Sequence, residues 1–139
     1  MPHFKLSLST AKVDDADRAL HGAIAAAIVS TYNKPLAVCF VEIVYGASLS
    51  FGGSADPCAV GQLDGIGAYA EDVNENFAGA VVAAIEAQTG IPKDRAFVKF
   101  CEYEADHWTL GGTTIRKRRE EAARKAAEAA KAAEATKAA

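Results

Sequence analysis

The sequence offers little from which to build a disulfide or zinc scaffold. Cys39, Cys58 and Cys101 are odd in number and widely spaced, and Gly61 stands where a C-x-x-C motif after Cys58 would need its second cysteine. The three histidines show no ligand spacing either. We therefore expect buried free thiols and no metal site.

Long apolar runs are also missing. No segment approaches the ~20 apolar residues that a membrane-spanning helix needs, and residues 1–10 lack the basic-then-apolar order of a signal peptide. We expect no membrane partner and a cytoplasmic location, and release without a signal peptide remains an alternative.

Charge divides the chain into two segments. Residues 1–115 hold 7 Lys and Arg against 14 Asp and Glu, whereas residues 116–139 hold 8 against 4. We predict a folded domain over 1–115 and an Ala/Lys/Glu-rich tail over 116–139. Such a composition favours helix, but the tail has no large apolar side chain with which to dock, so it should be a solvated helix or disordered. The basic run 116–119 fits a solvated charge run better than a nucleic-acid site.

The first 115 residues contain an internal repeat. Pro35 and Pro92 are 57 residues apart, and so are Phe40 and Phe97. Each copy has the pattern of strand, helix and strand: apolar alternation, then a helical apolar stripe behind acidic residues, then an apolar run. The expected strands cover residues 4–9, 38–44, 58–66 and 96–103. The first expected helix follows the cap-type residues Asp14 and Asp15 and runs to about residue 32, and the second starts at Glu71 and Asp72 and is closed by Gly90 and Pro92.

Two β-α-β units of this kind predict an α/β fold with a four-stranded mixed sheet and both helices on one face. Each crossover joins parallel strands and is right-handed. The second face of the sheet would lack a cover, and we expect it to be apolar. Since monomers rarely expose large apolar surfaces, this favours an oligomer.

The dipeptide Met1-Pro2 is a candidate catalytic feature. Removal of the initiator methionine would leave Pro2 with a free secondary amine. An α-amino group titrates near ~8, and burial or a nearby cation would lower that pKa towards neutral, as a general base requires. Strand 4–9 follows at once and would hold the nitrogen in place. Many proteins begin Met-Pro without such a role, so the dipeptide is weak evidence alone.

The segment Phe51–Cys58 carries two glycines but no phosphate-loop lysine, and a strand follows it, so it reads as a turn. Together with Met1-Pro2 it makes the chain resemble the macrophage migration inhibitory factor and D-dopachrome tautomerase family over residues 1–115. The matching residues are Met1-Pro2-x-Phe4, Asn33-Lys34-Pro35, Phe51-Gly52-Gly53-Ser54-x-x-Pro57-Cys58-Ala59, Ile66-Gly67 and Asp94-Arg95.

The resemblance implies the tautomerase-type β-α-β repeat, a homotrimer, and active sites between neighbouring subunits. Pro2 matches the catalytic base, and Lys34 the lysine that binds the substrate carboxylate. Ile66 matches a backbone contact to the substrate, and Phe97 an aromatic residue from the adjacent subunit. Further pocket positions, by the same resemblance, are Lys99, Trp108 and Ile115.

The implied reaction is keto–enol tautomerisation of an aromatic α-keto acid such as phenylpyruvate, with dopachrome as a second substrate, and it needs no metal or organic cofactor. The alternative is a cytokine-like signalling protein that acts through a receptor.

Lys99 departs from the family, which commonly has asparagine there. A lysine at this place would lower the pKa of Pro2, bind a more acidic substrate, or block the pocket. Leu110 and Ile115 replace the family's usual tryptophan and phenylalanine, and Gly61 argues against thiol–disulfide activity.

Overall fold

The computed structural model describes residues 1–67 and 69–138, which form two compact units, residues 1–102 and 103–139. The first unit contains the predicted repeat. Its sheet has the order β2-β1-β3-β4, in which β1 pairs parallel with β2 and antiparallel with β3, and β3 pairs parallel with β4. The mixed four-stranded sheet is therefore confirmed. The strands are β1 (His3–Leu8), β2 (Phe40–Val44), β3 (Ala59–Gly65) and β4 (Ala96–Glu102).

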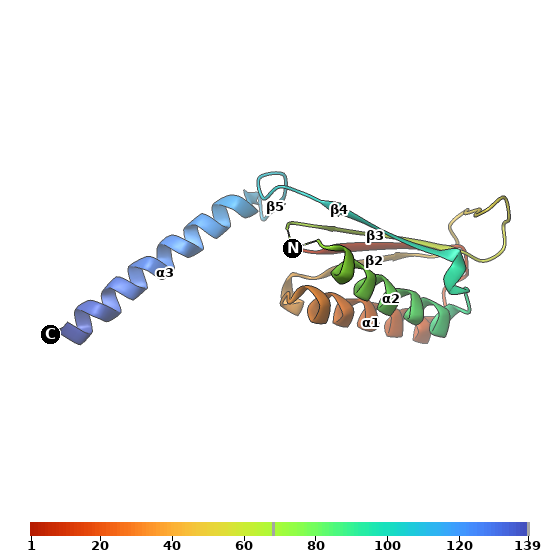
Figure 1. The fold of residues 1–139 in the computed structure, drawn as a ribbon, viewed down its shortest axis with the longest axis horizontal. Coiled ribbons are helices and arrows are strands. Elements are labelled where there is room, and N and C mark those ends of the chain that lie inside the picture. Colours follow the sequence, from red (N-terminus) through yellow and green to blue (C-terminus); the bar gives the residue numbers. More distant parts are fainter. Residues whose placement is uncertain (68, 139) are drawn as a thin grey trace. The chain divides into compact units, whose positions relative to one another are not determined.

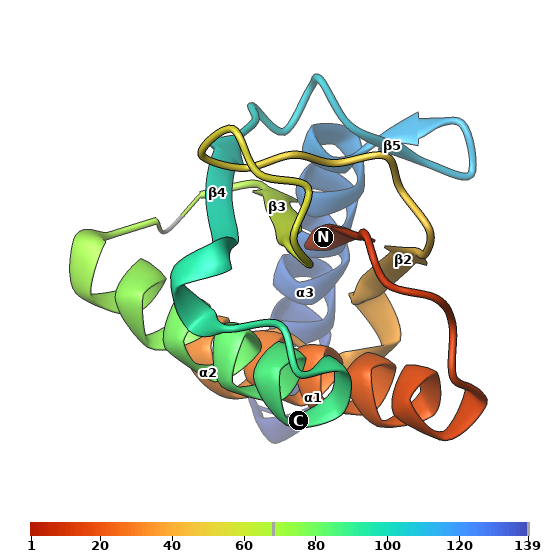
Figure 2. The same cartoon turned by 90° about the vertical axis from the view of Figure 1, so that its right-hand side faces the viewer.

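Both long helices lie on one face of this sheet, as predicted. Figures 1 and 2 show α1 (Asp14–Tyr32) and α2 (Glu71–Thr89) side by side beneath the strands. Acidic residues occupy the first turn of each helix, where the helix dipole favours them. Asn33 and Gly90 then end the helices in the left-handed conformation.

The core fills the space between the helices and the inner face of the sheet. Phe4 of β1 and Phe77 of α2 are fully buried, with ring centroids 5.5 Å apart in an edge-on contact. Burial of a side chain of this size contributes about 1.5–3 kcal/mol. The other large, fully buried side chains are Leu6, Leu8, Leu20, Ile24, Ile28, Leu63, Val81, Ile85 and Ile91.

The second predicted strand starts later than expected. Residues Leu36–Val38 form one turn of 3₁₀ helix after Pro35, and β2 begins only at Phe40. The same arrangement recurs in the second copy, where Lys93–Arg95 form a 3₁₀ turn after Pro92 and before β4. Both turns follow a proline, whose fixed φ suits the entry to a tight turn.

The uncovered face of the sheet, here the open face, is not the apolar surface that the pattern predicted. Seven of its twelve side chains are polar or charged, because the residues that alternate with the buried ones are mostly hydrophilic. Its large apolar members, Phe40 and Phe97, are 63% and 56% exposed. The open-face side chains are His3, Lys5, Ser7, Phe40, Glu42, Val44, Val60, Gln62, Asp64, Phe97, Lys99 and Cys101.

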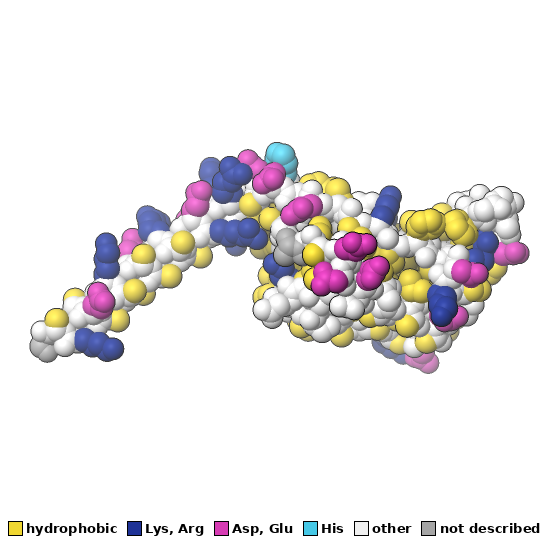
Figure 3. Space-filling model, viewed as in Figure 1, with side chains coloured by type: hydrophobic (Ala, Val, Ile, Leu, Met, Phe, Trp, Pro, Cys, Tyr) yellow, Lys and Arg dark blue, Asp and Glu magenta, His cyan; other side chains and the backbone are white. Residues whose placement is uncertain are grey.

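The second unit combines a short hairpin with a long helix. Strands β5 (Thr109–Leu110) and β6 (Thr113–Thr114) pair antiparallel, and α3 (Ile115–Ala138) follows directly. Apart from Ile115, every described residue of α3 is exposed. Figure 3 shows charged side chains of both signs along α3 with small alanines between them. The tail is thus helical, the first of the two predicted alternatives. No described helix is long and apolar enough to span a bilayer.

The start of α3 is closely tied to the hairpin and to the segment that precedes it. The backbone N–H groups of Ile115, Arg116 and Lys117 donate to the Trp108 carbonyl, the Ala105 carbonyl and the Thr114 hydroxyl, at 2.9, 2.9 and 3.2 Å. These bonds satisfy three amides that every helix leaves unpaired at its beginning. Arg116 also forms an ion pair with Asp106 at 3.2 Å, which offsets the cost of basic side chains at the positive end of the helix dipole.

Gly61 provides the first prediction. A Cβ atom at this position would lie 2.5 Å from Cζ of the fully buried Phe4 ring. We expect Gly61→Ala to destabilise the protein by about 1–3 kcal/mol, because the ring has no free space into which to move. The matched control is Gly79→Ala on α2, where a Cβ meets nothing within 4 Å and should stabilise the helix by about 0.5–1 kcal/mol. Urea unfolding measures both, and equal stabilities would contradict the packing argument.

Candidate active site

Pro2 lies in a buried position immediately before β1. Its carbonyl accepts a hydrogen bond from the Phe40 N–H at 2.9 Å, so β2 constrains it as well as the strand β1 that follows it. The pocket around it is nearly full while Met1 is present, with a free volume of about 10 Å³. That is hardly room for one water molecule. Its lining includes Met1, Pro2, Tyr32, Lys34, Ile66 and Tyr69.

The turn after α1 places Lys34 in this pocket. Asn33 adopts φ 50° and ψ 48°, which reverses the chain at the end of the helix. Lys34 then lies half-buried in the pocket wall beside Pro2. Among the described residues that line the pocket, Lys34 is the one with a cationic side chain, so it is placed to pair with an anionic group bound at the proline.

Ile66 reaches the same pocket from the end of β3. The residue is buried, and Gly67 follows with φ 76°, a conformation that side chains other than glycine rarely adopt. The structure thus brings together Pro2, Lys34 and Ile66, three of the residues that the family resemblance picked out. Three elements far apart in the sequence meet there.

Two tyrosines in the pocket were not predicted. The rings of Tyr32 and Tyr69 meet edge-on with centroids 5.6 Å apart, and the Tyr32 hydroxyl donates to Asn74 Oδ1 at 3.0 Å. Burial raises the pKa of Tyr32 to about 12 and also raises the pKa of Tyr69. Both phenols are therefore neutral near pH 7. The sequence held one indication that Tyr32 belongs to the pocket, because this residue stands next to the Asn33-Lys34 turn.

Phe97 and Lys99 do not line this pocket in the same chain. Both project from β4 on the open face and are exposed. The Phe97 ring meets Phe51 of the glycine segment edge-on, with centroids 5.2 Å apart.

Trp108 and Ile115 belong to the second unit. The Trp108 carbonyl accepts from the Ile115 N–H, and the indole ring meets Tyr103 edge-on with centroids 5.5 Å apart. Ile115 is buried. Within their unit these two residues hold the hairpin to the start of α3.

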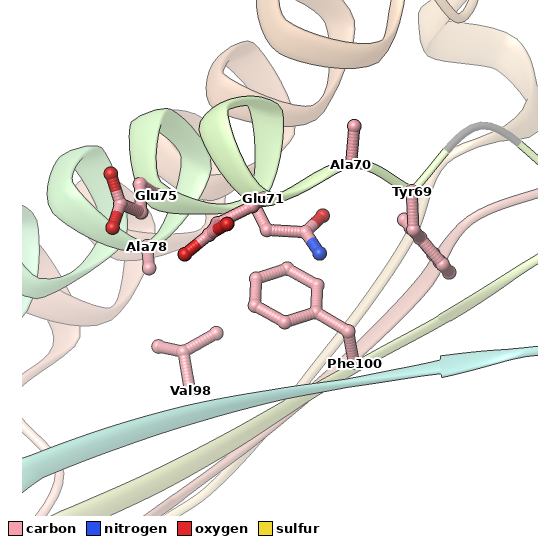
Figure 4. Close-up of a pocket in the computed structure, with 8 residues that line it drawn as sticks. Tyr69, Ala70, Glu71, Glu75, Ala78, Val98 and Phe100 are labelled. Atoms are coloured by element: carbon pink, nitrogen blue, oxygen red, sulfur yellow. The ribbon is translucent and has the colours of Figure 1, made fainter.

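A larger cavity, of about 540 Å³, lies between α2 and the edge strand β4 (Figure 4). Its floor is apolar, with Val98 and Phe100, and Glu71 and Glu75 stand at its rim. Acidic side chains also gather over α2 in Figure 3. Carboxylates at the rim would repel an anionic substrate, so this cavity suits an α-keto acid less well than the Pro2 pocket does. Among the described residues no cluster of His, Cys, Asp and Glu could hold a metal ion.

Arg95 is a further residue whose role the sequence did not reveal. Its guanidinium donates to the carbonyls of Phe51, Ser54, Asp56 and Pro57 at 3.0–3.3 Å. It also lies over the Phe51 ring, 5.4 Å from the centroid. One side chain thereby holds the whole glycine segment against the start of β4.

The second prediction concerns this clamp. Arg95→Lys should loosen residues 51–57, because one ammonium group cannot reproduce the planar fork of five donors. Amide exchange in this segment should accelerate at least tenfold, while exchange in β1 stays unchanged. Lys93→Gln, in the same 3₁₀ turn, is the control. Unchanged exchange in Arg95→Lys would show that the four contacts do not order the segment.

Comparison with known proteins gives consistent results. The family profile described as "Macrophage migration inhibitory factor (MIF)" matches residues 1–116. A macrophage migration inhibitory factor homolog from Trichinella spiralis is 30% identical over 115 residues, which cover 83% of this chain and all of the relative. The macrophage migration inhibitory factor structure from Toxoplasma gondii has a TM-score of 0.77 at 28% identity and covers 81% of this chain and 98% of its own.

A more distant structure shares the fold alone. It was solved after inactivation by 2-oxo-3-pentynoate, and it has a TM-score of 0.75 at 18% identity, covering 84% of this chain and 98% of its own.

Proposed function

The chain belongs to the macrophage migration inhibitory factor family, and from that premise we propose that it is a keto–enol tautomerase with Pro2 as its general base. The substrate is an aromatic α-keto acid such as phenylpyruvate. The observation that carries the proposal is the burial of Pro2 beside Lys34 in one pocket.

The proposal requires that Met1 be removed. Its loss converts the Pro2 nitrogen from an amide, which cannot accept a proton, into a secondary amine. It also removes one wall of a pocket that has almost no free volume at present. Burial and the nearby Lys34 both disfavour a charged ammonium and so lower the pKa of the amine towards neutral.

In the proposed reaction Lys34 binds the substrate carboxylate, and the buried Ile66 backbone and the tyrosine rings enclose the substrate. The Pro2 nitrogen takes a proton from the carbon next to the keto group. The electrons of that C–H bond form a C=C bond, and the carbonyl oxygen becomes an enolate. The proton carried by Pro2 then returns to this oxygen and gives the enol, so no cofactor takes part.

The complete site needs a second subunit. Phe97 and Lys99 lie on the exposed open face rather than in the pocket of their own chain, and we propose that a neighbouring copy supplies them in a homotrimer. The free edges of β2 and β4 and the exposed Phe40 and Phe97 rings support such an assembly. By the family resemblance, Trp108 and Ile115 are further predicted pocket residues, and we take residues 116–139 as a tail appended to the tautomerase domain 1–115.

A second function is signalling through a receptor. The relatives are named after inhibition of macrophage migration, and such an activity would depend on the surface of the assembly rather than on Pro2 chemistry. A variant at Pro2 that loses turnover and keeps receptor binding would separate the two functions.

The third prediction tests the base. Pro2→Gly should lower kcat/KM for phenylpyruvate about 10²–10⁴-fold, the usual contribution of a positioned general base. An otherwise unchanged chain that keeps one residue ahead of Pro2 should lose as much of its kcat/KM, because its proline nitrogen is an amide. Equal rates for wild type and Pro2→Gly would refute the proposed mechanism.

Labelling gives an independent readout of the same nitrogen. 2-Oxo-3-pentynoate is an electrophile to which an unprotonated secondary amine adds. Mass spectrometry should find one reagent molecule on the peptide that begins at Pro2, and no label on the N-terminal peptide of the extended chain.

The fourth prediction concerns Lys34. Lys34→Gln should raise KM for phenylpyruvate about tenfold, the equivalent of ~1.4 kcal/mol of lost carboxylate binding. KM for the methyl ester of the same substrate should change little, because the ester lacks the charge. Lys93→Gln serves as the exposed control. A similar loss with both substrates would assign Lys34 a structural role instead.

A further inference from the structure

A row of four polar side chains crosses the open face of the sheet. Strand register places Lys5 opposite Glu42 of β2 on one side and opposite Gln62 of β3 on the other, and Gln62 is opposite Lys99 of β4. Since neighbouring strands lie about 4.8 Å apart, the backbones of Lys5 and Lys99 are separated by about 10 Å. Both lysine side chains are long enough to reach the space above Gln62.

The acidic groups of this face already have partners. Glu42 contacts Lys5 Nζ at 3.4 Å and His3 Nε2 at 3.3 Å. Asp64 lies 3.7 Å from His3 Nδ1 and accepts a hydrogen bond from the Gln62 amide at 2.7 Å. Within residues 1–67 and 69–138, no acidic group lies within ion-pair distance of Lys99.

A hollow of about 140 Å³ lies between the two lysines. Lys5, Ser7, Gln62 and Lys99 provide its polar wall, and Val60 provides an apolar one. This volume is more than four times the roughly 30 Å³ that a water molecule takes in the liquid. The hollow is therefore large enough for a carboxylate or a phosphate group.

We propose that this hollow is an oxyanion-binding site, in which Lys99 and Lys5 hold a carboxylate or phosphate group with the help of the Ser7 hydroxyl and the second N–H of the Gln62 amide. All four side chains can donate, and oxyanions accept from several donors at once. The site stands apart from the Pro2 pocket of the same chain, with which it shares no lining residue. It does not depend on the proposed catalytic role of Pro2.

Two kinds of ligand carry a carboxylate or phosphate group of this kind. The ligand is a free oxyanion, or it is a second acidic group on a substrate that reaches the site from a neighbouring chain. Binding alone does not distinguish them, whereas competition with turnover does.

The experiment is a titration of the full-length protein with inorganic phosphate, with chloride added to keep the ionic strength constant. The readout is the NMR signal of the Gln62 side-chain amide, identified by its loss in Gln62→Met. We expect saturable binding to wild type and about three- to fivefold weaker binding to Lys99→Gln, the effect of removing one exposed charge partner. Lys93→Gln is the matched control and should bind as wild type does.

A second variant should shift affinity in the opposite direction. Glu42→Gln releases Lys5 from its ion pair, so phosphate should bind about three- to fivefold more tightly. Phosphate that competes in wild type with an α-keto acid bearing a second carboxylate, but not with phenylpyruvate, which has only one, assigns the site to a substrate's second acidic group. Saturable binding without competition against either compound assigns it to a free oxyanion. Unsaturable binding, or equal affinity in wild type and Lys99→Gln, would overturn the proposal, even if Pro2 proved to be the base.

Discussion

The hydrogen bond from the Phe40 amide to the Pro2 carbonyl ties the first residues of the chain to the sheet. Because β1 is an interior strand with partners on both sides, a residue directly ahead of it has little conformational freedom. Chain termini are usually loose, and a base that moves freely in water makes a poor catalyst. Placing the N-terminal strand inside the sheet converts the least ordered part of an ordinary chain into a fixed point around which a pocket can form.

Much of the fold could be predicted from the sequence because its signals are local. Acidic residues at the helix starts and Asn33 and Gly90 at the helix ends fix the limits of α1 and α2. The 57-residue repeat then implies a sheet built from two similar halves. The late start of β2 was missed because an apolar run such as 36–44 does not show where a 3₁₀ turn gives way to a strand.

The site was predicted only in part, for a physical reason. Pro2, Lys34 and Ile66 were found through their resemblance to a family, and the structure brings them together. Tyr69 and Arg95 act through contacts between distant segments, and nothing in their local sequence indicates those partners, whereas the place of Tyr32 beside the Asn33-Lys34 turn was a signal that went unused. The polarity of the open face was misjudged because five of its seven polar side chains belong to the interior strands β1 and β3, which were counted as part of an apolar sheet. The open face carries ion pairs among His3, Lys5, Glu42 and Asp64 beside the exposed Phe40 and Phe97 rings.

The exposed α3 has a geometric consequence of its own. A 24-residue helix rises about 36 Å from its first residue to its last, and its first turn is tied to the hairpin by backbone and side-chain bonds. Alanine-rich segments are commonly treated as flexible linkers. Here the segment is a stiff spacer, so anything joined to its far end would be kept at a set distance from Ile115 instead of sampling every distance up to full extension.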